Sequence, residues 1–244
     1  METQTNFLNA LNFRRSVRVY DHAQEIDSEL VKKCLELATL APNSSNMQLW
    51  EFHHITSQEI LKKLSIACLN QSAAKSAKEM VVIVVRKDLW KKRANANISH
   101  LKAIFGKKIS DEYSKREKFA INYYSKLIPF VYTDFLGVFG YFKYIISWLT
   151  GLFKPTYRQL RNSDIRIVAH KSAGLAAQTF MLSMATKGYD TCPMEGYDSI
   201  RIKKLLNLPY SSEINMVISC GIRKPEGVYG ERFRIPFNEV YKKW

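Results

Sequence analysis

The sequence Met80-Val81-Val82-Ile83-Val84-Val85 is apolar at every position and rich in β-branched side chains. A strand with one face in water alternates polar and apolar residues, whereas an unbroken run of this kind indicates a strand buried on both faces. We therefore expect the run to lie inside a sheet that is covered by helices on both sides.

The patterns that flank this run predict further strands and helices in alternation. Strands are expected over 50–55, 189–192 and 214–220. Helical spacing of apolar residues predicts helices over 6–15, 28–41, 56–69, 165–186 and 198–206. No repeat of 20–50 residues is visible. A length of 244 residues with 46% hydrophobic and 24% charged residues fits one globular domain over residues 1–244.

Residues 88–164 interrupt this alternation and are predicted to form a basic, aromatic helical insertion. Between Arg86 and Arg166 there are 17 basic and six acidic residues, so this third of the chain carries +11 of the net charge of +15. The longest charge-free run within it, Tyr144–Phe153, has ten residues. A helix that crosses a bilayer needs about 20 apolar residues, so a conventional transmembrane segment is not expected here.

Two interpretations of the insertion stay open. The favoured one is a helical lid that packs on the core. In the other, residues 127–153 form an amphipathic patch on an anionic membrane surface. That patch would direct Trp148, Phe142 and Tyr144 into the lipid and hold Lys143, Lys154 and Arg158 near the head groups. Binding of nucleic acid is not expected, because the aromatic residues cluster in an apolar run instead of alternating with basic ones.

Several common site types are absent from the sequence. Four widely spaced cysteines form no CxxC pair, which indicates a reduced, cytoplasmic protein, and Met1–Arg15 lacks a secretion signal. The five histidines do not fall at metal-ligand spacing, so no metal site is expected. Neither a GxGxxG motif after the first strand, nor a P-loop, nor a GxSxG elbow is present. We name no catalytic side chain.

Two short arginine clusters stand near the two ends of the chain. Arg14-Arg15-Ser16-Val17-Arg18 places three guanidiniums and a hydroxyl within five residues. Arg232-Phe233-Arg234, if extended, directs both arginines to one face. Guanidinium groups match phosphate oxygens in bidentate geometry, so two such clusters that meet in space would bind a phosphate monoester. Each cluster alone is more typical of a solvated basic surface.

Other motifs resolve this ambiguity when they are taken together with the arginines. In sequence order they are Arg14–Tyr20 (RRSVRVY), Ile26–Glu29 (IDSE), Ala41–Phe52 (APNSSNMQLWEF), Cys192–Asp198 (CPMEGYD), Leu205–Pro209 (LLNLP) and Arg232-x-Arg234. The series resembles the FMN-dependent nitroreductase family over residues 1–87 and 166–244, whereas the insertion is poorly matched. Asn43 and Leu49 depart from the family, which commonly has Ser and Pro there.

The resemblance implies roles for individual residues. Arg14, Ser16, Arg232 and Arg234 would hold the FMN phosphate, with Arg15 adjacent, and Arg18 would lie near the pyrimidine edge of the ring. Backbone N–H groups at Glu195 and Gly196, in the turn with Pro193 and Met194, would bond the flavin N5. Asn70 or Gln71 would address the amide edge of the ring. Across a dimer interface, the resemblance adds Pro42, Asn43, Ser44 and Asn46.

The resemblance also implies the overall assembly and activity. The expected fold is α+β, a nitroreductase-like mixed sheet sandwiched by helices, in a homodimer whose C-terminal tails wrap the partner. The expected activity is ping-pong transfer of hydride from NAD(P)H to FMN and then to a nitroaromatic or quinone-type acceptor. Other reactions on the same flavin fold stay open, namely those of a dehydrogenase, a dehalogenase or a flavin-fragmenting enzyme. A membrane-peripheral flavoprotein and, less favoured, a protein that binds nucleic acid through the basic insertion stay open as well.

Overall fold

A single antiparallel sheet of four strands lies at the centre of the molecule. The computed structural model describes residues 2–106, 112–134 and 138–244, with side chains from residue 7 onward. The strands are β1 (Trp50–Ile55), β2 (Glu79–Val85), β3 (Asp190–Met194) and β4 (Glu213–Gly221). They pair in the order β1-β2-β4-β3. The only parallel pairing among the described residues is an isolated bridge between Ser16 and Thr191, at the β3 edge.

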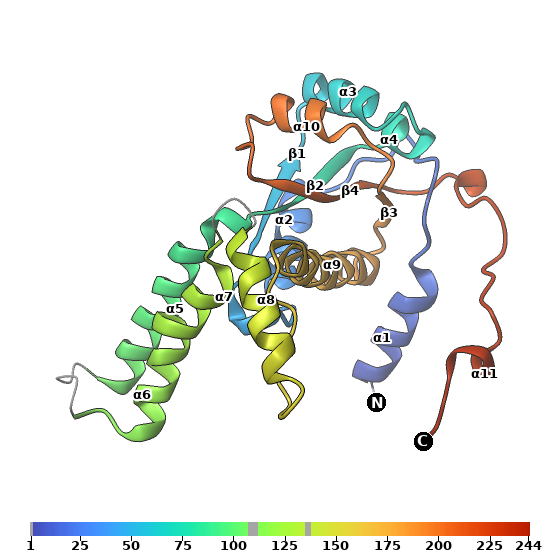
Figure 1. The fold of residues 1–244 in the computed structure, drawn as a ribbon. Coiled ribbons are helices and arrows are strands. Elements are labelled where there is room, and N and C mark those ends of the chain that lie inside the picture. Colours follow the sequence, from blue (N-terminus) through green and yellow to red (C-terminus); the bar gives the residue numbers. More distant parts are fainter. Residues whose placement is uncertain (1, 107–111, 135–137) are drawn as a thin grey trace.

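Strand β2 confirms the expectation from its sequence, because all seven of its residues are buried. Val81, Ile83 and Val85 belong to one core cluster, with residues of α2 (Ser28–Ala38) and α9 (Asn162–Thr186). Met80 and Val82 belong to the opposite cluster, with residues of α3 (Gln58–Ala67). Figure 1 shows these helices on the two sides of the sheet.

The layer below the sheet in Figure 1 contains α1 (Glu2–Phe13), α2 and α9. Asp27 caps α2 by accepting a hydrogen bond from the Glu29 N–H at 2.9 Å. Helix α9 ends at the predicted place: Lys187 is its C-cap and Gly188 follows with φ 74°, a conformation that favours glycine. α9 is longer at its start than the sequence predicted.

The layer above the sheet contains α3, α4 (Ser72–Ser76) and α10 (Ser199–Leu205). Asp198 caps α10 by accepting from the Arg201 N–H at 3.1 Å. Beyond β4 the chain runs through the short helices η5 (Pro225–Gly227) and α11 (Phe237–Val240) and is otherwise extended, as predicted for the tail.

Most of the described part of the insertion is helical, and residues 151–161 are an irregular connection to α9. The helical part comprises η2 (Lys87–Leu89), α5 (Trp90–Phe105), α6 (Lys115–Asn122), the π-helical turn η4 (Tyr123–Leu127), α7 (Ile128–Tyr132) and α8 (Val138–Thr150). Figure 1 shows α5 and α6 as an arm that projects from the body. Residues 107–111 and 135–137 of the predicted insertion lie outside the described residues. None of the described helices combines the length and the apolar character that crossing a bilayer requires.

One expectation for the insertion is wrong. Lys143 does not face outward, as the membrane interpretation required, because its side chain is only 2% exposed. Its Nζ donates hydrogen bonds to the carbonyls of Phe130, Val131 and Thr133 at 2.8–3.0 Å. These carbonyls lie at the end of α7 and lack partners within the helix, so they attract the cation inward.

Candidate functional site

The two arginine clusters near the ends of the chain meet at one cavity, as predicted for a phosphate site. A hollow of about 240 Å³ is lined by Arg14, Arg15, Ser16 and Arg18 from one end of the chain and by Val228–Arg234 from the other. The N-terminal cluster follows directly after α1, which ends at Phe13. The structure therefore brings together six predicted site residues: Arg14, Arg15, Ser16, Arg18, Arg232 and Arg234.

Backbone carbonyls hold two of these arginines in place. Arg232 Nη2 donates to the carbonyls of Leu11, Asn12 and Arg14 at 2.7–3.1 Å, at the C-terminal end of α1. Arg15 Nη2 donates to the carbonyl of Gly230 at 2.6 Å. Gly230 has φ 138°, a backbone conformation that residues other than glycine rarely adopt. The tail is thus tied to the N-terminal cluster by its own polar contacts.

Five arginines and a single carboxylate, that of Glu231, line the cavity, so it carries an excess of positive charge. Within the part of the chain that the structure describes, none of its five arginines forms an ion pair. Burial lowers the pKa of Arg14, and the nearby charges of Arg232, Arg234 and Arg15 lower it further. A dianion placed here would relieve this repulsion and accept the guanidinium N–H groups. The donor set therefore fits a phosphate ester.

The predicted turn over Pro193–Gly196 lies close to this cavity along β3. Val17 N–H donates to the Thr191 carbonyl at 3.2 Å, which places the N-terminal cluster beside β3. Burial raises the pKa of Cys192, and the nearby charges of Arg18 and Arg14 oppose that rise. Glu195 and Gly196 are exposed, and no hydrogen bond among the described residues uses their N–H groups. Two free backbone donors therefore follow the arginine cavity along the strand.

The structure separates the two candidates at positions 70 and 71. Gln71 Nε2 donates to the Gly196 carbonyl at 2.7 Å, so Gln71 lies against the turn. Asn70 has φ 55° and lines a different cavity of about 470 Å³, together with Lys75. Gln71 is accordingly the better placed of the two for a ligand on the 193–196 turn.

The loop with Pro42, Asn43, Ser44 and Asn46 lies apart from the arginine cavity within one chain. Ser44 N–H donates to Ser172 Oγ on α9 at 3.3 Å. Asn46 exchanges hydrogen bonds with Asn97 of α5 at 3.0 and 3.1 Å. Figure 1 places α5 and α1 near opposite ends of α9. A single chain therefore does not assemble the whole predicted set.

The departure at Asn43 has a structural reason. Asn43 Oδ1 accepts a hydrogen bond from the Gln48 N–H at 2.9 Å. The loop between them contains Ser45 and Asn46 with φ 54° and 48°, and Gln48 itself has φ 47°. An amide side chain reaches across this left-handed stretch and closes it. Asn43 is thus engaged with its own loop.

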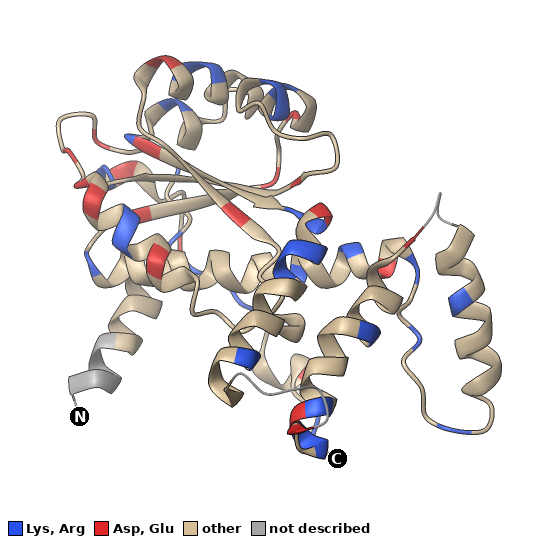
Figure 2. Cartoon of the chain, turned by 90° about the vertical axis from the view of Figure 1, so that its left-hand side faces the viewer, with Lys and Arg blue, Asp and Glu red and all other residues tan. Residues whose placement is uncertain are grey.

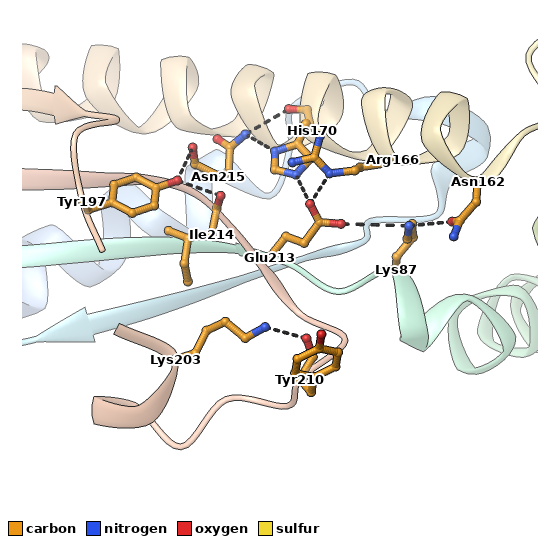
Figure 3. Close-up of polar contacts among 10 residues, drawn as sticks. All are labelled: Lys87, Asn162, Arg166, His170, Tyr197, Lys203, Tyr210, Glu213, Ile214 and Asn215. Carbon is orange, nitrogen blue, oxygen red and sulfur yellow. Dashed lines mark hydrogen bonds and ion pairs between the residues drawn. The ribbon is translucent and has the colours of Figure 1, made fainter. Parts of the chain in front are cut away.

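A polar network that the sequence analysis missed lies behind the turn (Figure 3). Tyr197, directly after Gly196, donates its hydroxyl to the carbonyls of Ile214 and Asn215 at 2.8 and 3.3 Å. Asn215 is the residue skipped in the pairing of β2 with β4, so it forms a β-bulge. Burial raises the pKa of Tyr197 to about 12, and the nearby Glu195 raises it too.

The same network continues from the bulge to α9. Asn215 Nδ2 lies 3.2 Å from Nδ1 of His170, and His170 Nε2 lies 3.2 Å from Glu213 Oε2. Arg166 also pairs with Glu213. Burial raises the pKa of Glu213, but the hydrogen bonds from Arg166 and His170 outweigh that and hold it below its usual range. His170 and Glu213 are 43 residues apart, so no local motif signals their contact.

Metal ligation has no support in the described residues: no three His, Cys, Asp or Glu side chains come together as a metal site. All four cysteines are buried, and none of them forms a disulfide.

Comparison with known proteins gives one consistent result. The sequence model described as "Nitroreductase family" matches residues 11–222. The Bacillus subtilis protein named NAD(P)H nitroreductase YdgI is 27% identical over 237 residues, 96% of each chain. The crystal structure of the nitroreductase ydfN from Bacillus subtilis superposes with a TM-score of 0.73 at 25% identity, over 99% of this chain and 100% of that one. A nitroreductase from Exiguobacterium sibiricum, solved in complex with FMN, shares the fold with a TM-score of 0.66 at 22% identity, over 98% and 97% of the chains.

Proposed function

The chain belongs to the nitroreductase family, and from this premise we propose that it is an FMN-dependent oxidoreductase. In this proposal NAD(P)H donates hydride and a nitroaromatic or quinone-type compound accepts two electrons in a ping-pong cycle. The observation that carries the proposal is the convergence of five arginines from both ends of the chain on one strongly basic cavity. FMN, when bound, supplies the atom that accepts and returns hydride.

The arginine cavity would hold the phosphate of FMN. Arg14 and Arg234 are the best placed for this role, because both line the cavity and Arg14 is already crowded by positive charge. Arg232 uses one nitrogen on carbonyls at and just after the end of α1 and would have its other donors for the phosphate. Ser16 adds a hydroxyl from the same wall. Arg15, anchored on Gly230, supports the wall and contributes charge.

The ring would lie along the turn after β3. Exposed N–H groups at Glu195 and Gly196 are donors for the ring atom that accepts hydride, and Pro193 and Met194 set the path of that turn. Gln71 Nε2 donates to the carbonyls of Gly196 and Cys68, so its amide oxygen is the group that would face the ring edge. Arg18 would add positive charge near a ring that becomes more electron-rich on reduction. These groups would bind and orient the ring, and none of them needs to transfer a proton.

A second copy of the chain would complete the site. The loop with Pro42, Asn43, Ser44 and Asn46 is remote from the arginine cavity within one chain, and a partner would supply it. The extended tail also points to a partner, because it exposes large apolar side chains: Phe233, Ile235, Phe237, Val240, Tyr241 and Trp244. Exposure of these side chains to water is unfavourable, and exchange of the tail between two subunits would bury them.

The phosphate assignment is tested with the double variant Arg14→Ala, Arg234→Ala. Each hydrogen bond to a charged group contributes about 1.5–3 kcal/mol, so loss of both arginines should weaken FMN binding by about two to four orders of magnitude. Fluorescence titration of the apoprotein with FMN measures the affinity. The matched control is Arg116→Ala, an exposed arginine on α6 outside the cavity.

The control variant should bind FMN as the wild type does. Equal affinity in the double variant and the control would place the phosphate elsewhere and reject the assignment.

The assembly is tested by truncation after Pro236, which removes α11 and the last residues but keeps both tail arginines. We expect the full chain to be a dimer by light scattering and the truncated chain to shift toward the monomer. A full chain that is monomeric at micromolar concentration, yet binds FMN fully, would remove the partner from the proposal.

A further inference from the structure

Helix α8 is folded with its polar side inward and its apolar side outward. A helix on the surface of a water-soluble domain does the opposite and directs an apolar stripe at the core. The buried residues of α8 are Gly140, Lys143 and Ser147, spaced three and four apart on one face. No other charged residue occurs in Val138–Thr150.

The inward face is held by hydrogen bonds to backbone. Lys143 Nζ bonds three carbonyls at the end of α7, and burial lowers its pKa while Asp134 opposes that. Ser147 Oγ donates to the Tyr157 carbonyl at 2.5 Å. Gly140 N–H donates to Asp134 Oδ1 at 2.9 Å, and a Cβ at Gly140 would meet the Arg161 backbone at 3.3 Å. The orientation of α8 is therefore fixed by specific contacts.

The outward face is apolar over roughly half of the helix circumference at 3.6 residues per turn. The exposed side chains on it and on the turn that follows are Val138, Phe139, Tyr141, Phe142, Ile145, Ile146, Trp148, Leu149, Leu152 and Phe153. Phe153, at the tip, is 89% exposed. Figure 2 shows α8 at the right-hand edge of the molecule, with no acidic segment on it and basic segments in the chain that returns from its tip.

We propose that residues 138–153 form a docking surface for an anionic lipid bilayer. At about 1.5 Å per residue, α8 is about 20 Å long, which is too short to cross a hydrocarbon core of about 30 Å. It suits insertion into one leaflet, with Trp148 and Tyr141 as aromatic anchors. The basic residues Lys154 and Arg158 follow the apolar tip and would meet the head groups.

The charge around this face favours anionic lipid as the occupant. The stretch from Arg86 to Arg166 carries +11 of the net charge of +15, so the part of the chain that bears α8 is strongly basic. Anionic head groups would attract the cations that flank α8, and the acyl region of the bilayer would accept its apolar face. The inference concerns the surface alone and does not depend on the flavin chemistry.

The test is co-sedimentation of the full-length protein with vesicles of phosphatidylcholine alone or with added phosphatidylserine. The variant carries Ile145→Glu and Leu149→Glu, both at exposed positions of the outward face. The matched control carries Ile66→Glu and Ile200→Glu, two exposed apolar residues on α3 and α10 with the same charge change. Light scattering and flavin content are measured on each preparation.

We expect the wild type and the control to pellet with anionic vesicles, less at high salt, and the α8 variant to lose at least about tenfold in partition coefficient. Absence of wild-type binding, or equal loss in the control, overturns the proposal. So does a dimer that the α8 substitutions split without any vesicle binding, since the face would then be an interface between copies. Flavin content reports separately on the proposed function.

Discussion

Strand β2 and helix α8 are both apolar almost throughout, yet β2 is buried and α8 directs its apolar side chains outward. Strand β2 has all seven residues buried, with alternate side chains in two separate core layers. Helix α8 buries a glycine, a lysine and a serine and exposes its large side chains. Hydrophobicity alone therefore does not tell whether a segment is core. The partners of its few polar groups decide which face turns inward.

The largest expected effect contrasts equal substitutions in the two elements. Ile83→Ala removes a fully buried side chain and should lower the free energy of unfolding by about 2–5 kcal/mol. Ile145→Ala changes an exposed side chain and should stay within about 0.5 kcal/mol. Urea unfolding measures both. Similar losses in the two variants would mean that the outward face of α8 is covered within the folded protein in solution.

A second prediction concerns the inward lysine. Lys143→Met leaves the carbonyls at the end of α7 without their donor and should destabilise the packing of α8 by about 2 kcal/mol. Hydrogen exchange should rise in α7 and α8 and stay unchanged in β2. Lys154→Met, at an exposed position just beyond α8, is the control and should not alter exchange. Unchanged exchange in Lys143→Met would contradict the role given to this lysine.

The smallest expected effect lies in the network at the start of β4. The pKa of Glu213 is held below its usual range, so its charge stabilises the fold at neutral pH and that contribution is lost as the pH falls through the folded-state pKa. Glu213→Gln should therefore cost about 1 kcal/mol at pH 7 and progressively less under more acidic conditions. Urea unfolding at several pH values measures this difference in unfolding free energy between the wild type and the variant. A free-energy difference that stays constant with pH would contradict a stabilising role for the Glu213 charge.

Most of the fold follows from local sequence patterns. The run Met80–Val85 predicted a doubly covered strand, and Asp27 and Gly188 marked a helix start and a helix end that the structure confirms. Orientation within the insertion did not follow, because the hydrogen bonds of Lys143 reach carbonyls 10–13 residues away. Hydropathy patterns carry no information on such contacts.

The candidate site likewise has residues that local sequence motifs predicted and residues that only the structure revealed. Residue types within short motifs pointed to the arginines, and the cavity brings them together. The choice between Asn70 and Gln71 needed the structure, because a turn of left-handed residues at positions 69 and 70 decides which side chain faces Gly196. Tyr197, Asn215 and His170 escaped prediction because a β-bulge and α9 bring distant residues together.

The most direct test of the central claim is anaerobic titration of the purified, FMN-loaded protein with NADPH and, separately, with NADH. The proposed function predicts that the visible flavin absorption band bleaches with one of these donors and returns when a quinone is added. A protein that takes up no FMN, or whose bound flavin neither donor reduces, would contradict it.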